Sequence, residues 1–188
     1  PLPGWIAAAA PRDDTPPRLI RPSDAVDTEP TPSPPGDTRR FQRGLVIHAL
    51  LARLPETGSD RRFDVASRFA AAQGFAPDEA EALAREVVAV LEHPGFAAAF
   101  GPDSRAEAGL VADLPELGDG ARVNGRVDRL AVTPEEVLIL DFKTNRPPPR
   151  SEAQVAPVYL GQMALYRAAA ARIFPGRRIV CGLLFTDG

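Results

Sequence analysis

The chain has 188 residues, a formal net charge of −3, 44% hydrophobic residues and one cysteine. This length suits one domain with a substantial core, and the acidic balance excludes a protein whose overall positive charge attracts nucleic acid. A lone thiol excludes a disulfide framework within the chain and any zinc or iron–sulfur site built from several of its cysteines. Because no apolar run is long enough to cross a membrane and no secretory signal opens the sequence, we expect a cytoplasmic protein.

Prolines crowd the N-terminal part of the chain, as in PPRLIRPSDAVDTEPTPSPPG at 16–36. Few apolar residues follow Ile20 and none recurs with a regular period, so the pattern predicts an extended linker over residues 1–38 rather than a packed element. The folded domain is expected over residues 39–188. Because the sequence opens on PLPGW without a methionine and stops soon after the strand-like RRIVCGLLF, we expect a piece of a longer polypeptide.

Three helices are predicted at the start of the domain. The segment 39–54 has apolar residues at helical spacing and stops before Pro55. The segment 59–74 begins on Ser-Asp and ends on glycine. The segment 77–95 has proline in its first turn, acids directly after it and Pro-Gly at its end, which is typical of a complete helix.

The pattern then changes to short apolar runs typical of strands, at 104–114, 121–133 and 135–144, with turn residues between them. A further helix is predicted over 158–174, and a last strand over 179–185. Three helices, three strands, a helix and a strand predict an α/β or α+β domain on a mixed sheet.

The third predicted strand ends in charged residues. Its apolar run VLIL at 137–140 is typical of a strand buried on both faces, yet Asp141 and Lys143 follow directly. If this strand forms a hairpin with its predecessor, Asp128 approaches Asp141, and Asp141 and Lys143 point to the same side. Two adjacent carboxylates repel each other unless a cation lies between them, and oxygen ligands favour Mg²⁺ or Mn²⁺. The lysine would then position a metal-bound water.

A D-x-K pair at a strand end has a plainer interpretation, a solvated edge or an ion pair, and the two strands alone leave both interpretations open. Two further motifs extend the pattern, RGLVIHALL at 43–51 and YLGQMALYR at 159–167. With GRVDRLAVTPEEVLILDFKTNR at 125–146 they resemble the RecB-family branch of the PD-(D/E)XK nucleases, and most closely the C-terminal nuclease domain of AddA-type helicase-nucleases. The resemblance runs from about Arg39 to the end of the chain.

The resemblance implies a restriction-endonuclease-like core, with a central mixed sheet flanked by helices and an N-terminal helical part. It implies that the catalytic residues are Asp128, Asp141 and Lys143, and that the metal ligands are His48, Asp128, Asp141 and the backbone carbonyl of Phe142. On its own, His48 in an apolar helical stripe would be interpreted as a core histidine.

Other candidates lie around these residues. Gln162 and Tyr166 form the family's Q-x-x-x-Y motif and share one helix face, from which they would hold a phosphate or orient Lys143. The arginines that would contact backbone phosphates, or serve only as solubilising charge, are Arg126, Arg129 and Arg146. Glu107 is a looser match to an acid near the site, with a surface glutamate as the alternative.

The resemblance implies a Mg²⁺-dependent DNA exonuclease, with Mn²⁺ as a possible substitute, that acts in DNA end resection during double-strand-break repair. Its expected partners are DNA, the helicase portion of the same full-length chain and an AddB-like subunit. AddB-type relatives carry cysteines for an iron–sulfur cluster, which the single Cys181 excludes here, and no nucleotide-binding P-loop occurs. The alternatives are a non-catalytic DNA-binding or docking module that retains the nuclease fold, and a metal-binding domain acting on another phosphodiester.

Overall fold

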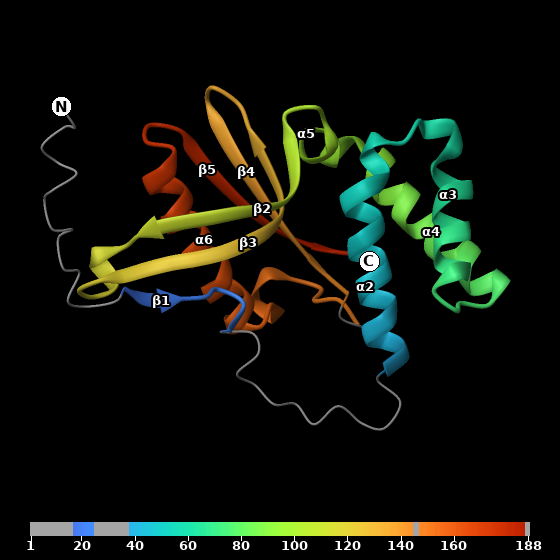
Figure 1. Ribbon diagram of the computed structural model, residues 1–188, viewed down its shortest axis with the longest axis horizontal. Coiled ribbons are helices and arrows are strands. Elements are labelled where there is room, and N and C mark those ends of the chain that lie inside the picture. Colours follow the sequence, from blue (N-terminus) through green and yellow to red (C-terminus); the bar gives the residue numbers. More distant parts are fainter. Residues whose placement is uncertain (1–16, 25–37, 145–146, 187–188) are drawn as a thin grey trace, which may run out of the picture.

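The computed structural model describes residues 17–24, 38–144 and 147–186 (Figure 1). A mixed sheet lies between two groups of helices. The strands are β1 Arg18–Ile20, β2 Ser104–Asp113, β3 Ala121–Val132, β4 Glu136–Lys143 and β5 Arg178–Phe185. The helices are α2 Thr38–Arg53, α3 Ser59–Ala72, α4 Pro77–Glu92, α5 Ala97–Phe100 and α6 Pro157–Ile173, with short 3-10 turns at Leu54–Glu56, Pro94–Phe96, Pro115–Leu117 and Glu152–Gln154.

The predicted helices and strands of the domain are confirmed, and so is the α/β class with a central mixed sheet flanked by helices. Local signals set several boundaries. For example, α4 has Pro77 in its first turn, and the Glu79 carboxylate accepts a hydrogen bond of 3.0 Å from the Ala76 N–H. None of the helices in the described part of the chain combines the length and the apolar composition needed to cross a lipid bilayer.

The sheet has the order β1-β3-β4-β5, with β2 paired to β3 outside this path. Strands β2, β3 and β4 are antiparallel neighbours, whereas β5 runs parallel to β4 and β1 runs parallel to β3. The predicted hairpin between β3 and β4 is confirmed, because Thr133 N–H donates to the Glu136 carbonyl at 2.8 Å. Helix α6 supplies the crossover that parallel strands require.

Strand β4 is buried on both faces, as its continuous apolar run predicts. Val137 and Ile139 belong to one core cluster, together with Met163 and Tyr166 of α6. Its alternate residues belong to a second cluster, formed with α2, α3 and α4, which includes Leu140 and Phe142. The C-terminal end of β4 therefore emerges between two helical layers.

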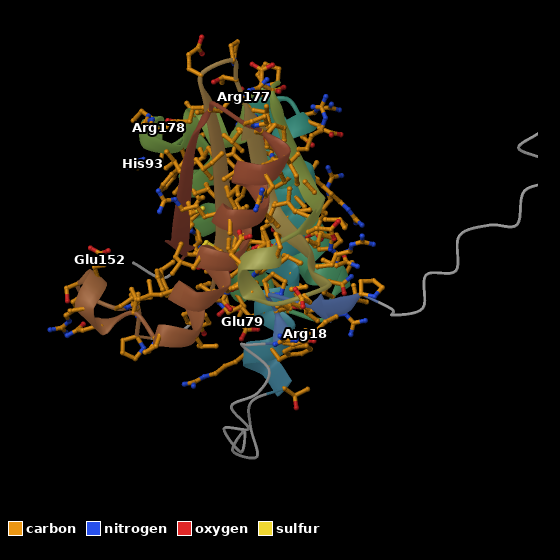
Figure 2. The ribbon with its side chains drawn as sticks, turned by 90° about the vertical axis from the view of Figure 1, so that its left-hand side faces the viewer. Arg18, Glu79, His93, Glu152, Arg177 and Arg178 are labelled. Atoms are coloured by element: carbon orange, nitrogen blue, oxygen red, sulfur yellow. The ribbon has the colours of Figure 1, made fainter. Side chains whose placement is uncertain are left out.

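Figure 2 shows Arg178, at the start of β5, and Arg18, in β1, at opposite ends of the sheet.

Residues 17–24 differ from the expected linker, because this segment packs onto the sheet. Arg18–Ile20 pair in parallel with Ala121–Val123, and Arg18 N–H donates to the Gly120 carbonyl at 2.8 Å. Three paired residues are too few to show a period in the sequence, and their stability comes from β3, which is remote in the chain. Trp5, Ile6 and the other linker residues outside 17–24 lie outside the described residues.

Pro22 anchors this segment on β3 beside α6. Its side chain is fully buried. A Cβ atom built on Gly125 would lie 2.9 Å from Cδ of Pro22 and 2.7 Å from Cε1 of Tyr166. Only glycine leaves room for both rings at this point of β3, so the upstream segment and α6 meet over one residue.

We expect Gly125→Ala to lower the free energy of unfolding by about 1–3 kcal/mol, the usual effect of overpacking a filled site. Gly109→Ala is the matched control, since it lies in the adjacent strand β2 and its new Cβ would meet nothing within 4 Å. Urea unfolding followed by circular dichroism measures both variants. Equal stability of the two would contradict the tight contact among Pro22, Gly125 and Tyr166.

Candidate active site

The β3–β4 pairing ends where the candidate carboxylates lie. The last regular pair joins Arg129 to Leu140. Beyond it, the Phe142 N–H donates to Oδ2 of Asp128 at 2.6 Å, so a side chain takes the place of a main-chain acceptor. This charge-assisted hydrogen bond fixes the Asp128 carboxylate beside the backbone that joins Asp141 to Lys143.

Helix α2 brings His48 to the same carboxylate. His48 Nδ1 lies 3.2 Å from Oδ1 of Asp128, and its ring stands edge-on to the Phe142 ring with 5.6 Å between centroids. One turn earlier, a Cβ on Gly44 would lie only 2.9 Å from Oγ1 of Thr144. Glycine at this position lets α2 approach the end of β4 closely enough for His48 to reach Asp128. The G-x-x-x-H motif therefore has a steric basis here.

Asp141 and Lys143 lie on one side of β4, as the period of two predicts. Lys143 Nζ is 2.5 Å from Oδ2 of Asp141, and their side chains are 11% and 7% exposed. The ammonium also donates to Oε1 of Gln162 at 3.0 Å and lies 4.4 Å from the centroid of the Tyr159 ring. A buried ammonium thus has a carboxylate, an amide and an aromatic face around it.

Sequence reasoning missed Tyr159. It stands three residues before Gln162 and so shares its helix face, which was the available signal. A second signal was the composition, because Lys143 is the one lysine among the 22 basic residues of the chain. All the other basic residues are arginines, so the compact ammonium group at this strand end stands out from the rest of the chain.

Tyr166 has a different position from the expected substrate contact. It is 1% exposed, and its hydroxyl donates to the Arg126 carbonyl at 2.8 Å. Burial raises the pKa of Tyr166 to about 12, so the phenol stays protonated and acts as a donor. Tyr166 therefore ties α6 to the main chain of β3, whereas Gln162 contacts Lys143 directly.

The charges of the site influence one another. Burial raises the pKa of Asp141, with Lys143 opposing the shift and the Asp128 carboxylate adding to it. Burial alone would lower the pKa of His48, but the hydrogen bond to Asp128 and the charges of Asp128 and Asp141 together raise it above its usual value. The two carboxylates therefore create a negative field that favours a cation.

The donor types fit a hard divalent cation. The carboxylate oxygens of Asp128 and Asp141 are donors of the type that Mg²⁺ and Mn²⁺ prefer, and His48 adds an imidazole beside them. Oδ2 of Asp141 is a buried anionic oxygen that lies against the Lys143 ammonium at 2.5 Å, so a positive charge already occupies this position. Within residues 17–24, 38–144 and 147–186, no three His, Cys, Asp or Glu side chains already form a metal-binding group. Cation binding would have to replace the contacts that His48 and Lys143 now make with the two aspartates.

Arg126, Glu107 and Arg129 make their contacts outside this cluster. Arg126 Nε pairs with Oε2 of Glu107 at 2.8 Å, and both side chains are exposed. Arg129 was expected at the surface, but it is 5% exposed, with its guanidinium 5.1 Å from the Phe100 ring centroid. The β3 register turns it inward, where an aromatic face partly replaces water. Arg146 lies outside the described residues.

Glu107 has an unexpected backbone role. With φ at 53° it is the one non-glycine residue of the described chain in the left-handed region. It stands opposite Asp128, between the pairs Ala106–Arg129 and Ala108–Val127.

At Glu107 and Asp128, the alternation of side chains between the two faces of the sheet is shifted by one residue in both strands. Before Glu107, Ser104 Oγ donates to the Ala99 carbonyl on the α5 side, and Arg129 lies over Phe100 on that same side. After it, Ala108 and its partner Val127 pack in the core under α6. Asp128 sits at the reversal, where it contacts His48 from α2 and influences Asp141 on the α6 side.

The sequence profile of the PD-(D/E)XK nuclease superfamily matches residues 23–186 of the chain. Among solved structures, one titled "Crystal structure of SSO0001" is similar at 14% identity and a TM-score of 0.31, over 73% of this chain and 68% of that chain. No curated protein sequence matches the chain.

Glu107→Gly should be no less stable than the wild type, because glycine removes a left-handed backbone cost of roughly 1–2 kcal/mol. Glu107→Val should be less stable by about 1–2 kcal/mol, since a β-branched residue resists that conformation. Arg126→Ala is the control that removes only the exposed ion pair and should change stability by less than about 1 kcal/mol. Urea unfolding compares the three. If valine were tolerated as well as glycine, the reversal at Glu107 would not require its left-handed backbone.

Proposed function

The chain belongs to the PD-(D/E)XK nuclease superfamily, whose members cleave phosphodiester bonds, and we propose that it is a divalent-metal-dependent DNA exonuclease domain. The observation that supports this proposal most strongly is the cluster at the end of β4. Asp128 contacts His48 at 3.2 Å, and Asp141 forms an ion pair with Lys143. Lys143 also donates a hydrogen bond to Gln162. A merely structural strand end would not need two carboxylates, an imidazole and a buried ammonium.

The residues divide into two roles. Asp128, Asp141, His48 and the Phe142 carbonyl would hold the cation. When bound, a divalent cation polarises the scissile phosphate and lowers the pKa of an attacking water. Lys143 would position that water and stabilise the charge that develops on the phosphate. Gln162 and Tyr159 contact the Lys143 ammonium, so they would hold it at the site if Asp141 served as a metal ligand.

We propose further that the domain is part of an AddA-type helicase-nuclease that resects DNA ends during double-strand-break repair. The three motifs around His48, Asp141 and Gln162 support this placement. The helicase portion of the full-length chain and an AddB-like subunit would deliver the strand, since a net charge of −3 gives the domain no overall positive field that would attract DNA from a distance. Burial raises the pKa of Cys181 to about 11, which suits an inert thiol rather than a cluster ligand.

Lys143→Ala should reduce cleavage by orders of magnitude while Mn²⁺ affinity persists or rises, because the carboxylates remain and lose a competing cation. Lys143→Arg is the matched control that keeps the charge. It should also be inactive, since a planar guanidinium cannot occupy the place of the ammonium between Asp141 and Gln162. Asp141→Ala should lose metal binding and cleavage together.

The measurements are degradation of labelled single-stranded DNA with Mg²⁺ or Mn²⁺ and calorimetric Mn²⁺ binding. Normal cleavage by Lys143→Ala would contradict the assignment of Lys143. If the wild type bound DNA but cleaved none of it with either metal, the chain would be a non-catalytic docking module.

A further inference from the structure

Helix α2 carries an exposed apolar stripe beside the site. Phe41 and Leu45 are 70% and 56% exposed, more than any other large hydrophobic side chain in the described residues. They are four residues apart and His48 follows three later, so all three lie along one side of the helix. The opposite side of α2 packs against the core, where Val46, Ile47 and Leu50 are buried. Among the residues that the structure describes, the stripe is therefore left out of the core packing.

The stripe leads directly to the catalytic cluster. At 1.5 Å per residue, Leu45 lies about 5 Å and Phe41 about 10 Å along the helix axis from His48. His48 itself contacts Asp128 at 3.2 Å. A chain lying along this side of α2 would thus reach the candidate metal ligands at its end.

The charge of α2 favours one kind of partner for the stripe. The sequence TRRFQRGLVIHALLAR contains four arginines and no acid, in a protein whose net charge is −3. Glu79 and Glu86 of α4 pair with Arg39 and Arg43 on the side away from the stripe. Arg40 is exposed beside Phe41. An apolar protein surface would account for Phe41 and Leu45 but would not need an exposed arginine beside them. A polyanion with planar bases uses both features, because its bases stack on an exposed ring and its phosphates pair with arginine.

We propose that Phe41 and Leu45 form a contact surface for the unpaired bases of single-stranded DNA, with Arg40 contacting its phosphates. Bases in a duplex are stacked on each other and present no free face to an aromatic ring, so this surface selects a single strand. The inference rests on the proposed nuclease function and adds to it the form of the substrate and its path along α2.

The test measures binding of a fluorescein-labelled mixed-sequence single strand, and of the corresponding blunt duplex, to the 188-residue chain in EDTA by anisotropy. Phe41→Ala should weaken single-strand binding roughly 5- to 150-fold, the range for loss of one base–aromatic stack. Phe41→Trp should retain it, because the ring face remains. In cleavage assays with Mn²⁺, Phe41→Ala should raise KM and leave kcat unchanged.

Phe63→Ala is the matched control, since Phe63 is an exposed phenylalanine on α3, away from the stripe. It should change neither binding nor cleavage. If wild type cleaves DNA and Phe41→Ala binds and cleaves single strands as the wild type does, the surface is wrong while the nuclease function stands. The surface is equally wrong if Phe41→Ala alters only self-association in size-exclusion chromatography. If the wild type cleaves no DNA, the proposed function fails and this inference fails with it.

Discussion

The burial of Asp141 and Lys143 at the end of a strand covered on both faces is the constraint on which the rest of the site depends. Taking two charges out of water costs several kcal/mol for each ion unless partners compensate. The partners come from every side: Gln162 and Tyr159 from α6 hold the ammonium, while the neighbouring Asp128 is held by His48 and the Phe142 N–H. An arrangement this costly for stability is retained where charge must be available to chemistry.

The positions of these partners depend on close approaches elsewhere in the fold. Gly44 lets α2 reach the end of β4, and Gly125 lets Tyr166 and Pro22 share one point on β3. Tyr166 fixes α6 to the Arg126 carbonyl, one turn from the glutamine that contacts Lys143. Residues 17–24, helix α2, strands β3 and β4 and helix α6 therefore act together on one strand end. The geometry of the site therefore depends on the whole domain, and substitutions far from the carboxylates should change the positions of its side chains.

Much of this could be predicted from the sequence because the signals are local. Helical spacing in α2 and α4, the apolar run of β4 and the spacing of Asp141 and Lys143 each reflect a period that the backbone imposes. The features that could not be predicted depend on contacts between residues that are remote in the sequence, or on a backbone conformation without its usual residue. Three residues of β1 show no period, the inward position of Arg129 needs Phe100, and the left-handed Glu107 lacks the glycine or asparagine that usually marks such a backbone.

A metal site at the end of β4 can be tested with a crystal of the chain soaked in Mn²⁺ and measured for anomalous scattering. We expect one strong peak at about 2.0–2.4 Å from oxygens of Asp128 and Asp141, with His48 and the Phe142 carbonyl completing the protein ligands. We also expect the Asp141 carboxylate to have turned from Lys143 toward the metal while the ammonium stays on Gln162. A peak elsewhere, or none while Asp141 remains paired with Lys143, would mean that this strand end is not a metal-dependent active site.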